Sequence, residues 1–208
     1  MVRDFYTFAV KTGKMSELNN ISTKDLYKNL FNRLFNLIIK PASEWKKIVS
    51  ENKNLNDVLS EFTLPLLAIV TLTAFLDHLF NYQGFEIGIA VKKALIVFTS
   101  LFGGLYLAYY ILRNLLPKIG IESENDKTFS FVAYSSGYWY LVTFVTLLAS
   151  ELLILKLFGI YSLYIVWKYF EVDKKPEKSQ KILITLAVAI IIHAAPIIIQ
   201  VVLNKLIG

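Results

Sequence analysis

Five long runs of apolar residues constrain this chain more than any other feature of its sequence. They cover residues 62–80, 94–116, 128–150, 152–170 and 182–203, and charged stretches separate most of them. A bilayer core about 30 Å thick needs about 20 helical residues. The runs therefore predict an all-α fold, a polytopic membrane helix bundle with about five transmembrane helices.

The ends of the runs are marked unequally. Pro117 stops the second run, whereas the third and fourth are separated by little more than Ser150 and Glu151. A proline cannot continue a helix without losing a backbone hydrogen bond. The third and fourth runs must form a tight helical hairpin, or one of them is re-entrant.

The positions of the basic residues predict the orientation. With the N-terminus inside, 18 of the 22 Lys and Arg residues lie on the cytoplasmic side, as the positive-inside rule requires. Residues 1–61 are then a cytoplasmic N-terminal segment, and 62–208 a five-span domain whose C-terminus lies outside. The net charge of +6 is attributed to topology rather than to nucleic-acid binding. The abundance of Lys, Ile and Asn suggests the cytoplasmic membrane of a bacterium or an archaeon.

A cytoplasmic amphipathic helix is predicted near residues 24–40. At about 100° per residue, apolar side chains occupy one half of its circumference and polar ones the other. Ser22 and Asp25 have the spacing of a capping box, and Pro41 marks the far end. The apolar half contains Leu26, Tyr27, Leu30, Phe31, Leu34, Phe35, Leu37 and Ile38.

The apolar half of this helix is the main candidate contact surface. It can lie in the headgroup plane or pack on the cytoplasmic ends of the spans, because both bury the same face. A second helix from Ser43 would place Trp45 where it suits an interfacial anchor. The candidate contacts with the membrane surface or with a protein partner are Leu30, Phe31, Leu34, Phe35, Ile38 and Trp45.

Three ionisable residues in or near the spans are candidate functional groups, since charge is costly in a bilayer. Asp77 and His78 lie near the outer end of the first span, where the headgroups would solvate them if the helix ended at Leu76. His193 lies midway along the fifth span, three residues before Pro196. A structural hydrogen bond to backbone or to a tyrosine is one interpretation of His193, and a proton or ion relay with Asp77 is the other.

The chemistry of metals, cofactors and nucleophiles finds little support in the sequence. The chain has no cysteine and only two histidines, and no motif pairs a serine with an activating base. We therefore expect no cofactor, no metal and no catalytic residue. Ser100, Gly104 and Ala108 form a stripe of small residues, which permits close packing inside the bundle or an oligomer.

The order of these features resembles the Yip (Ypt-interacting protein) domain family, in particular its compact prokaryotic members. The likeness runs from about Leu30 to the C-terminus, and Gly137 follows the Tyr-Ser pair where the family commonly has proline. It rests on the amphipathic segment, the spacing of the spans and the residues Pro41, Trp45, Ile48, Ala133, Tyr134, Ser135 and Ser136.

The resemblance implies a cytoplasmic N-terminal segment, a membrane adaptor or scaffold role and no enzymatic activity. Eukaryotic relatives bind Rab-type GTPases, a partner that we do not transfer to this chain because its composition is not that of a Golgi protein. The expected partners are the lipid bilayer and a protein at the N-terminal segment. The alternative is a small transporter or channel subunit that uses His193 or Asp77.

Overall fold

The computed structural model describes residues 22–81, 86–149, 159–173 and 176–207, and these contain helices and no β-strand. The first two described helices, α2 (Thr23–Ile39) and α3 (Pro41–Glu51), are together termed the arm. In chain order the elements are α2 (Thr23–Ile39), α3 (Pro41–Glu51), α4 (Leu55–Val58), the π-helix η1 (Leu59–Thr63), α5 (Leu64–Asn81), α6 (Ile87–Leu115), the 3-10 helix η2 (Leu116–Ile119), α7 (Asn125–Leu148), α8 (Tyr161–Val172) and α9 (Lys181–Ile207).

Four helical stretches are long and apolar enough to cross a membrane. They cover 55–80, where α4, η1 and α5 follow one another, 87–119, 125–148 and 181–207. Four of the five predicted spans therefore correspond to long apolar helices, and the prediction of a membrane helix bundle is confirmed.

Of the fourth predicted span, 152–170, only residues 159–170 are described. They overlap α8 (Tyr161–Val172), which has 12 residues and is about 18 Å long at 1.5 Å per residue. The ring of Tyr161 packs on Tyr138 halfway along α7, with centroids 5.4 Å apart. Tyr169 stacks on Phe131 at 3.9 Å, nearer the start of α7. The helix α8 thus runs antiparallel to α7 and begins at its mid-height. Residues 150–158, including the predicted turn at Ser150 and Glu151, lie outside the described residues.

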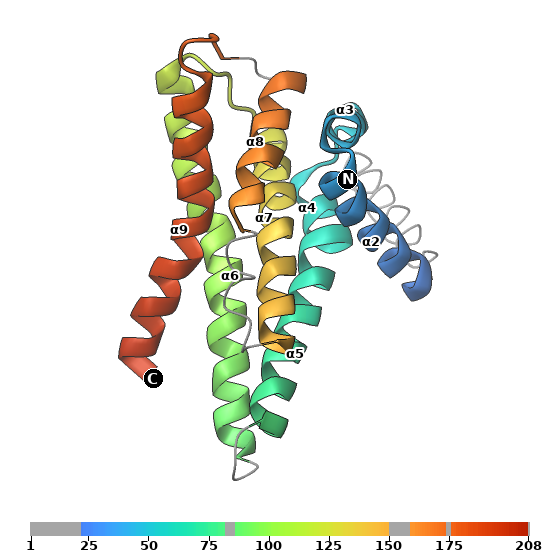
Figure 1. Cartoon of the computed structure of the whole chain (residues 1–208), viewed down its shortest axis with the longest axis vertical. Helices are drawn as coiled ribbons and strands as arrows, with labels where there is room; N and C mark the ends of the chain where they lie inside the picture. Colours follow the sequence, from blue (N-terminus) through green and yellow to red (C-terminus); the bar gives the residue numbers. More distant parts are fainter. Residues whose placement is uncertain (1–21, 82–85, 150–158, 174–175, 208) are drawn as a thin grey trace, which may run out of the picture.

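Neighbouring contacts fix the directions of the helices. The Leu55 N–H at the start of α4 donates to the Asp126 carboxylate at the start of α7. The Tyr140 hydroxyl of α7 donates to the Leu101 carbonyl in the middle of α6. Figure 1 shows α5, α7 and α9 running one way and α6 and α8 the other. The end of the bundle that carries α2 and α3 is termed the arm end, and the opposite one the far end.

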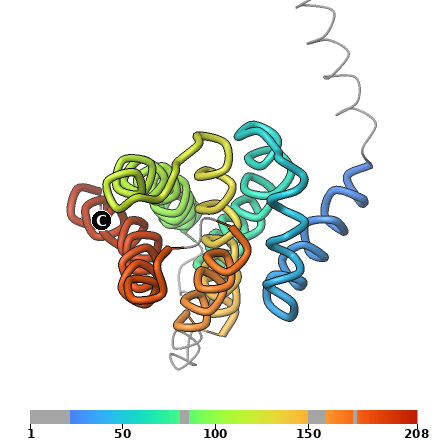
Figure 2. The backbone as a smooth tube through the Cα atoms, turned by 90° about the horizontal axis from the view of Figure 1, so that it is seen from above, coloured from blue at the N-terminus to red at the C-terminus, as the bar shows by residue number. Residues whose placement is uncertain are grey.

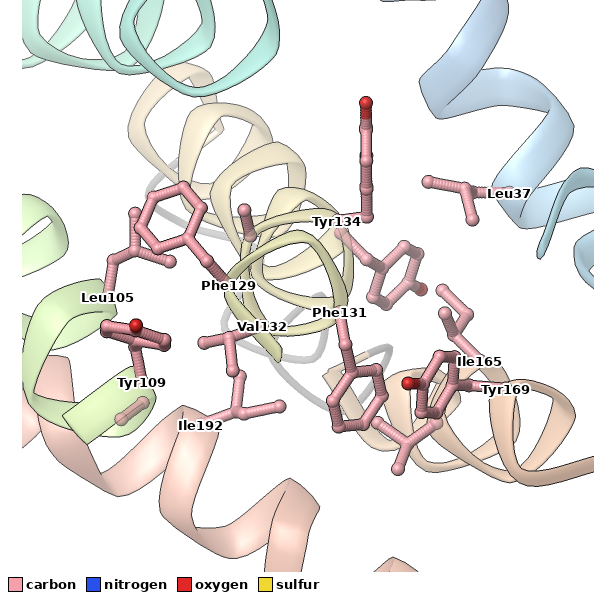
Figure 3. Close-up of a cluster of buried hydrophobic side chains, with 14 of the residues drawn as sticks. Leu37, Leu105, Tyr109, Phe129, Phe131, Val132, Tyr134, Ile165, Tyr169 and Ile192 are labelled. Atoms are coloured by element: carbon pink, nitrogen blue, oxygen red, sulfur yellow. The ribbon is translucent and has the colours of Figure 1, made fainter. Parts of the chain in front are cut away.

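The helix α7 occupies the centre of the bundle. Seen from above, it lies among α5, α6, α8 and α9 (Figure 2), and nearly all its residues from Thr128 to Tyr140 are buried. Phe129 points to α6, where it meets Tyr109 edge-on at 5.4 Å, while Phe131 points to α8 (Figure 3). A helix that is apolar on every side is stable only when neighbours surround it, and α7 meets this condition.

The helices α6 and α9 approach closely through the stripe of small residues. Ser100, Gly104 and Ala108 are all buried, and a Cβ added to Gly104 would lie 2.6 Å from the Pro196 backbone. Only glycine allows this approach. Packing inside the bundle is therefore observed at Gly104, which faces α9, and an oligomer stays a prediction.

The docked arm as candidate functional site

The apolar half of α2 divides into two faces. Leu30, Leu34 and Leu37 are 1 to 3% exposed and point into the bundle, and the Tyr161 hydroxyl of α8 donates to the Ile38 carbonyl at 2.6 Å. Leu34 reaches to the middle of α7, where a Cβ on Gly137 would lie 3.6 Å from its methyl group. The inner face of α2 is therefore packed on the bundle.

Trp45 joins α3 to the bundle. Its side chain is fully buried, and its indole N–H donates to the Ile165 carbonyl of α8 at 3.0 Å. Its ring also packs on Phe131, Tyr134 and Tyr169, with centroids 5.0 to 6.4 Å apart. The expectation that Trp45 is an interfacial anchor is wrong, because the protein interior satisfies both its apolar ring and its donor.

Arg33 connects α2 to α3 and α7. It donates to Glu44 at 2.8 Å and to both carboxylate oxygens of Glu51 at 2.6 and 2.7 Å. The Glu44 side chain is only 4% exposed and that of Arg33 16%. The guanidinium also lies 5.7 Å from the ring centroid of Tyr134, within the range of cation–π attraction. Arg33 is thus turned inward, although the helical wheel places it on the polar half.

The charge of Arg33 is maintained by its partners. Burial on its own would lower the pKa of Arg33, but the hydrogen bonds to Glu51 and the nearby carboxylates outweigh this effect and raise it. A buried cation with paired acceptors is stable, whereas either partner alone would be costly. Removal of Arg33 or of the buried Glu44 would therefore leave a poorly compensated charge and weaken the docking of the arm.

A second ion pair connects the arm to the first span. Lys53 donates to Glu61 at 2.6 Å and lies 3.8 Å from Glu51. Glu61 lies in the π-helix η1, which ends two residues before Pro65. In a regular α-helix the ring of Pro65 would clash with the carbonyl of residue 61, and the wider π-helical turn avoids this clash. Between α2, η1 and Tyr134 lies a cleft of about 60 Å³ lined by these charged groups. That volume admits water rather than a larger ligand.

The outward face of α2 is apolar and unoccupied by the described residues. Phe31, Phe35 and Ile39 are 50, 61 and 55% exposed, and the exposed Lys24 and Lys28 lie in the same row at 100° per residue. These five residues are termed the outer stripe. It runs along a helix whose opposite side is packed on the bundle (Figure 1).

The ends of α2 agree with the sequence only in part. The helix ends at Ile39 and Pro41 begins α3, as predicted. The capping box is wrong, since Ser22 is the residue before the helix but its side chain makes no capping hydrogen bond.

The candidate residues in the spans are placed as follows. Asp77 and His78 are half-buried and still helical, because α5 continues to Asn81 at the far end. His193 Nδ1 lies 2.7 Å from the Ala189 carbonyl of its own helix, and its ring meets Trp139 edge-on at 4.9 Å. His193 thus bonds a backbone carbonyl, one of the two kinds of hydrogen-bond partner expected. Its contact with α7 is made through the aromatic ring of Trp139.

The structure does not bring His193 and Asp77 together. The ring of Phe62 packs on Tyr134 at 4.6 Å, and α5 and α7 run in the same direction. Asp77 lies about 22 Å beyond Phe62 along α5, whereas Trp139, the neighbour of His193, lies about 8 Å beyond Tyr134. The two ionisable groups are therefore about 15 Å apart along the bundle axis, too far for direct proton transfer, which needs hydrogen-bond reach.

The described residues also contain no candidate metal site. Among the described residues, no group of three or more His, Asp or Glu side chains is arranged to hold a metal ion. The arrangement that does converge is that of the arm, with an ion-paired inner side and an apolar outer side.

Comparison with known proteins gave one match. The family model described as Yip1 domain matches residues 35–199, from the C-terminal half of α2 to the last turns of α9. Searches of curated proteins and of solved structures gave no significant match.

Proposed function

The chain belongs to the Yip1 domain family, and we propose that it is a non-enzymatic scaffold that organises the surrounding membrane through the outer stripe of α2. The multi-pass bundle anchors the protein, and the arm holds the stripe against one leaflet. The observation that carries the proposal is the combination of a buried inner face with an exposed apolar outer face on one short helix.

The energetics support insertion of the stripe at a membrane surface. Complete burial of a large apolar side chain is worth roughly 1.5 to 3 kcal/mol, and the stripe offers two phenylalanines and an isoleucine. An isolated helix of this length is marginal in water, but α2 is already ordered by Arg33 and by its leucines. Little conformational entropy is then lost on insertion.

The charge of the stripe supports the cytoplasmic leaflet as its target. Lys24 and Lys28 precede the apolar residues in the same row, and each lysine near an anionic surface contributes about 1 kcal/mol. The parts of α6 and α9 nearest the far end carry three lysines, Lys92, Lys93 and Lys205. Most of the other basic residues in the described part of the chain lie toward the arm end, which supports a cytoplasmic arm by the positive-inside rule.

The test uses the full chain reconstituted in liposomes. A helix inserted on one side of a bilayer expands that leaflet, so liposomes with much wild-type protein should become smaller in cryo-electron micrographs. The variant Phe31→Ser/Phe35→Ser removes most of the apolar stripe and should abolish the change at equal protein density. Neither residue contributes to the buried core, so the bundle should remain folded.

The matched control is Asn32→Ser/Asn36→Ser, which changes two residues of the same helix outside the stripe and should behave as the wild type. Liposomes whose size is unaffected by wild-type protein at any density would overturn the membrane-organising function. The same conclusion would follow if the stripe variant and the wild type were equally active.

A further inference from the structure

The surface between α8 and α9 contains a groove that neither the family nor the arm accounts for. It has a volume of about 320 Å³, at the lower end of the range for small-molecule sites. Tyr164, Ile182 and Leu186 are exposed along it, and Leu163, Trp167 and Thr185 complete its lining. It opens on the outside of the bundle, where a membrane protein meets lipid.

One polar group in the groove has no partner. Thr185 is 4% exposed, and its hydroxyl oxygen has no hydrogen-bond partner. A threonine in a helix commonly bonds the carbonyl one turn earlier, and a buried polar group without a partner costs free energy. The Thr185 oxygen is enclosed by protein, so it can pair with a bound molecule only after its side chain turns toward the groove.

The arm end of the groove is positively charged. Glu171 accepts hydrogen bonds from Lys168 at 2.7 Å, from Lys181 at 3.1 Å and from the Trp167 indole at 2.7 Å. Lys181 also lies over the Trp167 ring at 3.9 Å. Two ammonium groups share one carboxylate, so the cluster keeps one net positive charge. Each ammonium has three donors, which leaves donors for a further anion.

The order of groups along the groove matches that of a phospholipid. Along α9, Lys181 comes first, Thr185 lies one turn (about 6 Å) farther toward the far end, and Leu186 follows. Along α8 the antiparallel order is Lys168, Tyr164 and then the apolar Leu163. In a phospholipid the phosphate, the ester oxygens and the acyl chain follow one another in this order.

We propose that the groove between α8 and α9 binds one anionic phospholipid. The phosphate lies at Lys168 and Lys181, an ester oxygen lies beside Thr185, whose hydroxyl turns to donate to it on binding, and an acyl chain lies along Tyr164 and Leu186. This site is independent of the outer stripe, which belongs to another helix.

The proposal is tested on the full chain in detergent with equal amounts of phosphatidylglycerol and phosphatidylcholine, by native mass spectrometry of the retained lipid. One net positive charge should favour phosphatidylglycerol about fivefold, which corresponds to about 1 kcal/mol. Lys168→Gln and Lys181→Gln should each reduce the ratio to about one. The control Lys118→Gln changes an exposed lysine of η2 and should leave it unchanged.

Two further variants separate binding from loss of structure. Glu171→Gln frees both lysines and should raise the preference by about another fivefold, opposite to the lysine variants. Leu186→Trp fills the groove and should reduce the amount of retained lipid, whereas Leu183→Trp, which lies on the same helix less than one turn earlier and does not line the groove, should not. Equal retention of both lipids by the wild type would overturn the proposal, and so would equal losses in the two tryptophan variants.

Discussion

Replacement of Arg33 by methionine should release α2 from the bundle. Methionine keeps much of the apolar stem but leaves Glu44, which is 4% exposed, with only the exposed Lys47 at 3.6 Å as a cation. Breaking a buried ion pair on one side costs about 3 to 5 kcal/mol. The contact with Glu51 adds little to this value, because that side chain is 33% exposed and such pairs are worth about 0 to 1 kcal/mol.

The cost should be visible in amide hydrogen exchange, which measures local opening. A loss of about 3 kcal/mol corresponds to exchange of the α2 amides about a hundredfold faster, while α6 and α9 remain as in the wild type. Replacing both partners, as in Arg33→Met/Glu44→Leu, removes the poorly compensated buried carboxylate and should restore exchange to within about tenfold.

The matched control is Lys53→Met, which breaks the part-buried pair with Glu61. It should change α2 exchange by less than about fivefold, because the two side chains are 29 and 30% exposed and solvent screens such a pair. Unchanged α2 exchange in Arg33→Met would show that the ion pair does not hold the arm. Exchange in the double variant as fast as in Arg33→Met would show that the buried Glu44 carboxylate, left with Lys47 alone, is not the cause of the release.

Three further predictions concern the bundle. Gly104→Ala should lower the unfolding free energy by about 1 to 3 kcal/mol in thermal unfolding, because its Cβ meets the α9 backbone. The control Gly88→Ala, whose Cβ meets nothing within 4 Å, should not lower it, and equal effects of the two variants would contradict the close approach of α6 and α9. Trp45→Phe keeps the ring contacts but loses the bond to α8, so it should cost about 2 to 3 kcal/mol in the same assay; an unchanged midpoint would contradict the docking of α3. Hydrogen bonding from Lys168 holds the pKa of Glu171 at about 2, below the value of about 4.3 in an unfolded chain. Its stabilisation is therefore complete above pH 4.3 and is lost as the pH falls toward 2, so Glu171→Gln should lose less stability than the wild type between pH 5 and 3, and parallel losses would contradict this assignment.

The long helices can be predicted from the sequence because a bilayer imposes a length and a composition on every span. In the run 152–170 only residues 159–170 are described, and they contribute to α8, whose side chains pack on neighbouring helices. Hydropathy shows which segments are apolar, but an apolar segment can be buried in lipid or in the protein interior. Ile165 and Val166 are buried inside the protein, and only their packing on the neighbouring helices distinguishes the two cases.

The arm shows a similar limit. The helical wheel identifies the apolar half of α2 but cannot divide it, because the packed Leu34 and the exposed Phe35 are equally apolar. Leu34→Asp would therefore disrupt docking on the bundle, and Phe35 is the residue that tests contact with the membrane. The ion pairs of Arg33 could not be predicted either, since its partners lie 11 and 18 residues away and depend on the turn between α2 and α3.

The central claim is that the outer stripe of the docked arm lies in the membrane. It is tested most directly by labels on single cysteines, which the cysteine-free chain allows at Phe31, Asn32 and Phe35 in the full-length protein in liposomes. Fluorophores at Phe31 and Phe35 should be quenched by spin-labelled lipid, and that at Asn32 should be quenched mainly by iodide in water. If all three positions are equally accessible to iodide and insensitive to the lipid quencher, the stripe does not enter the membrane and the account is contradicted.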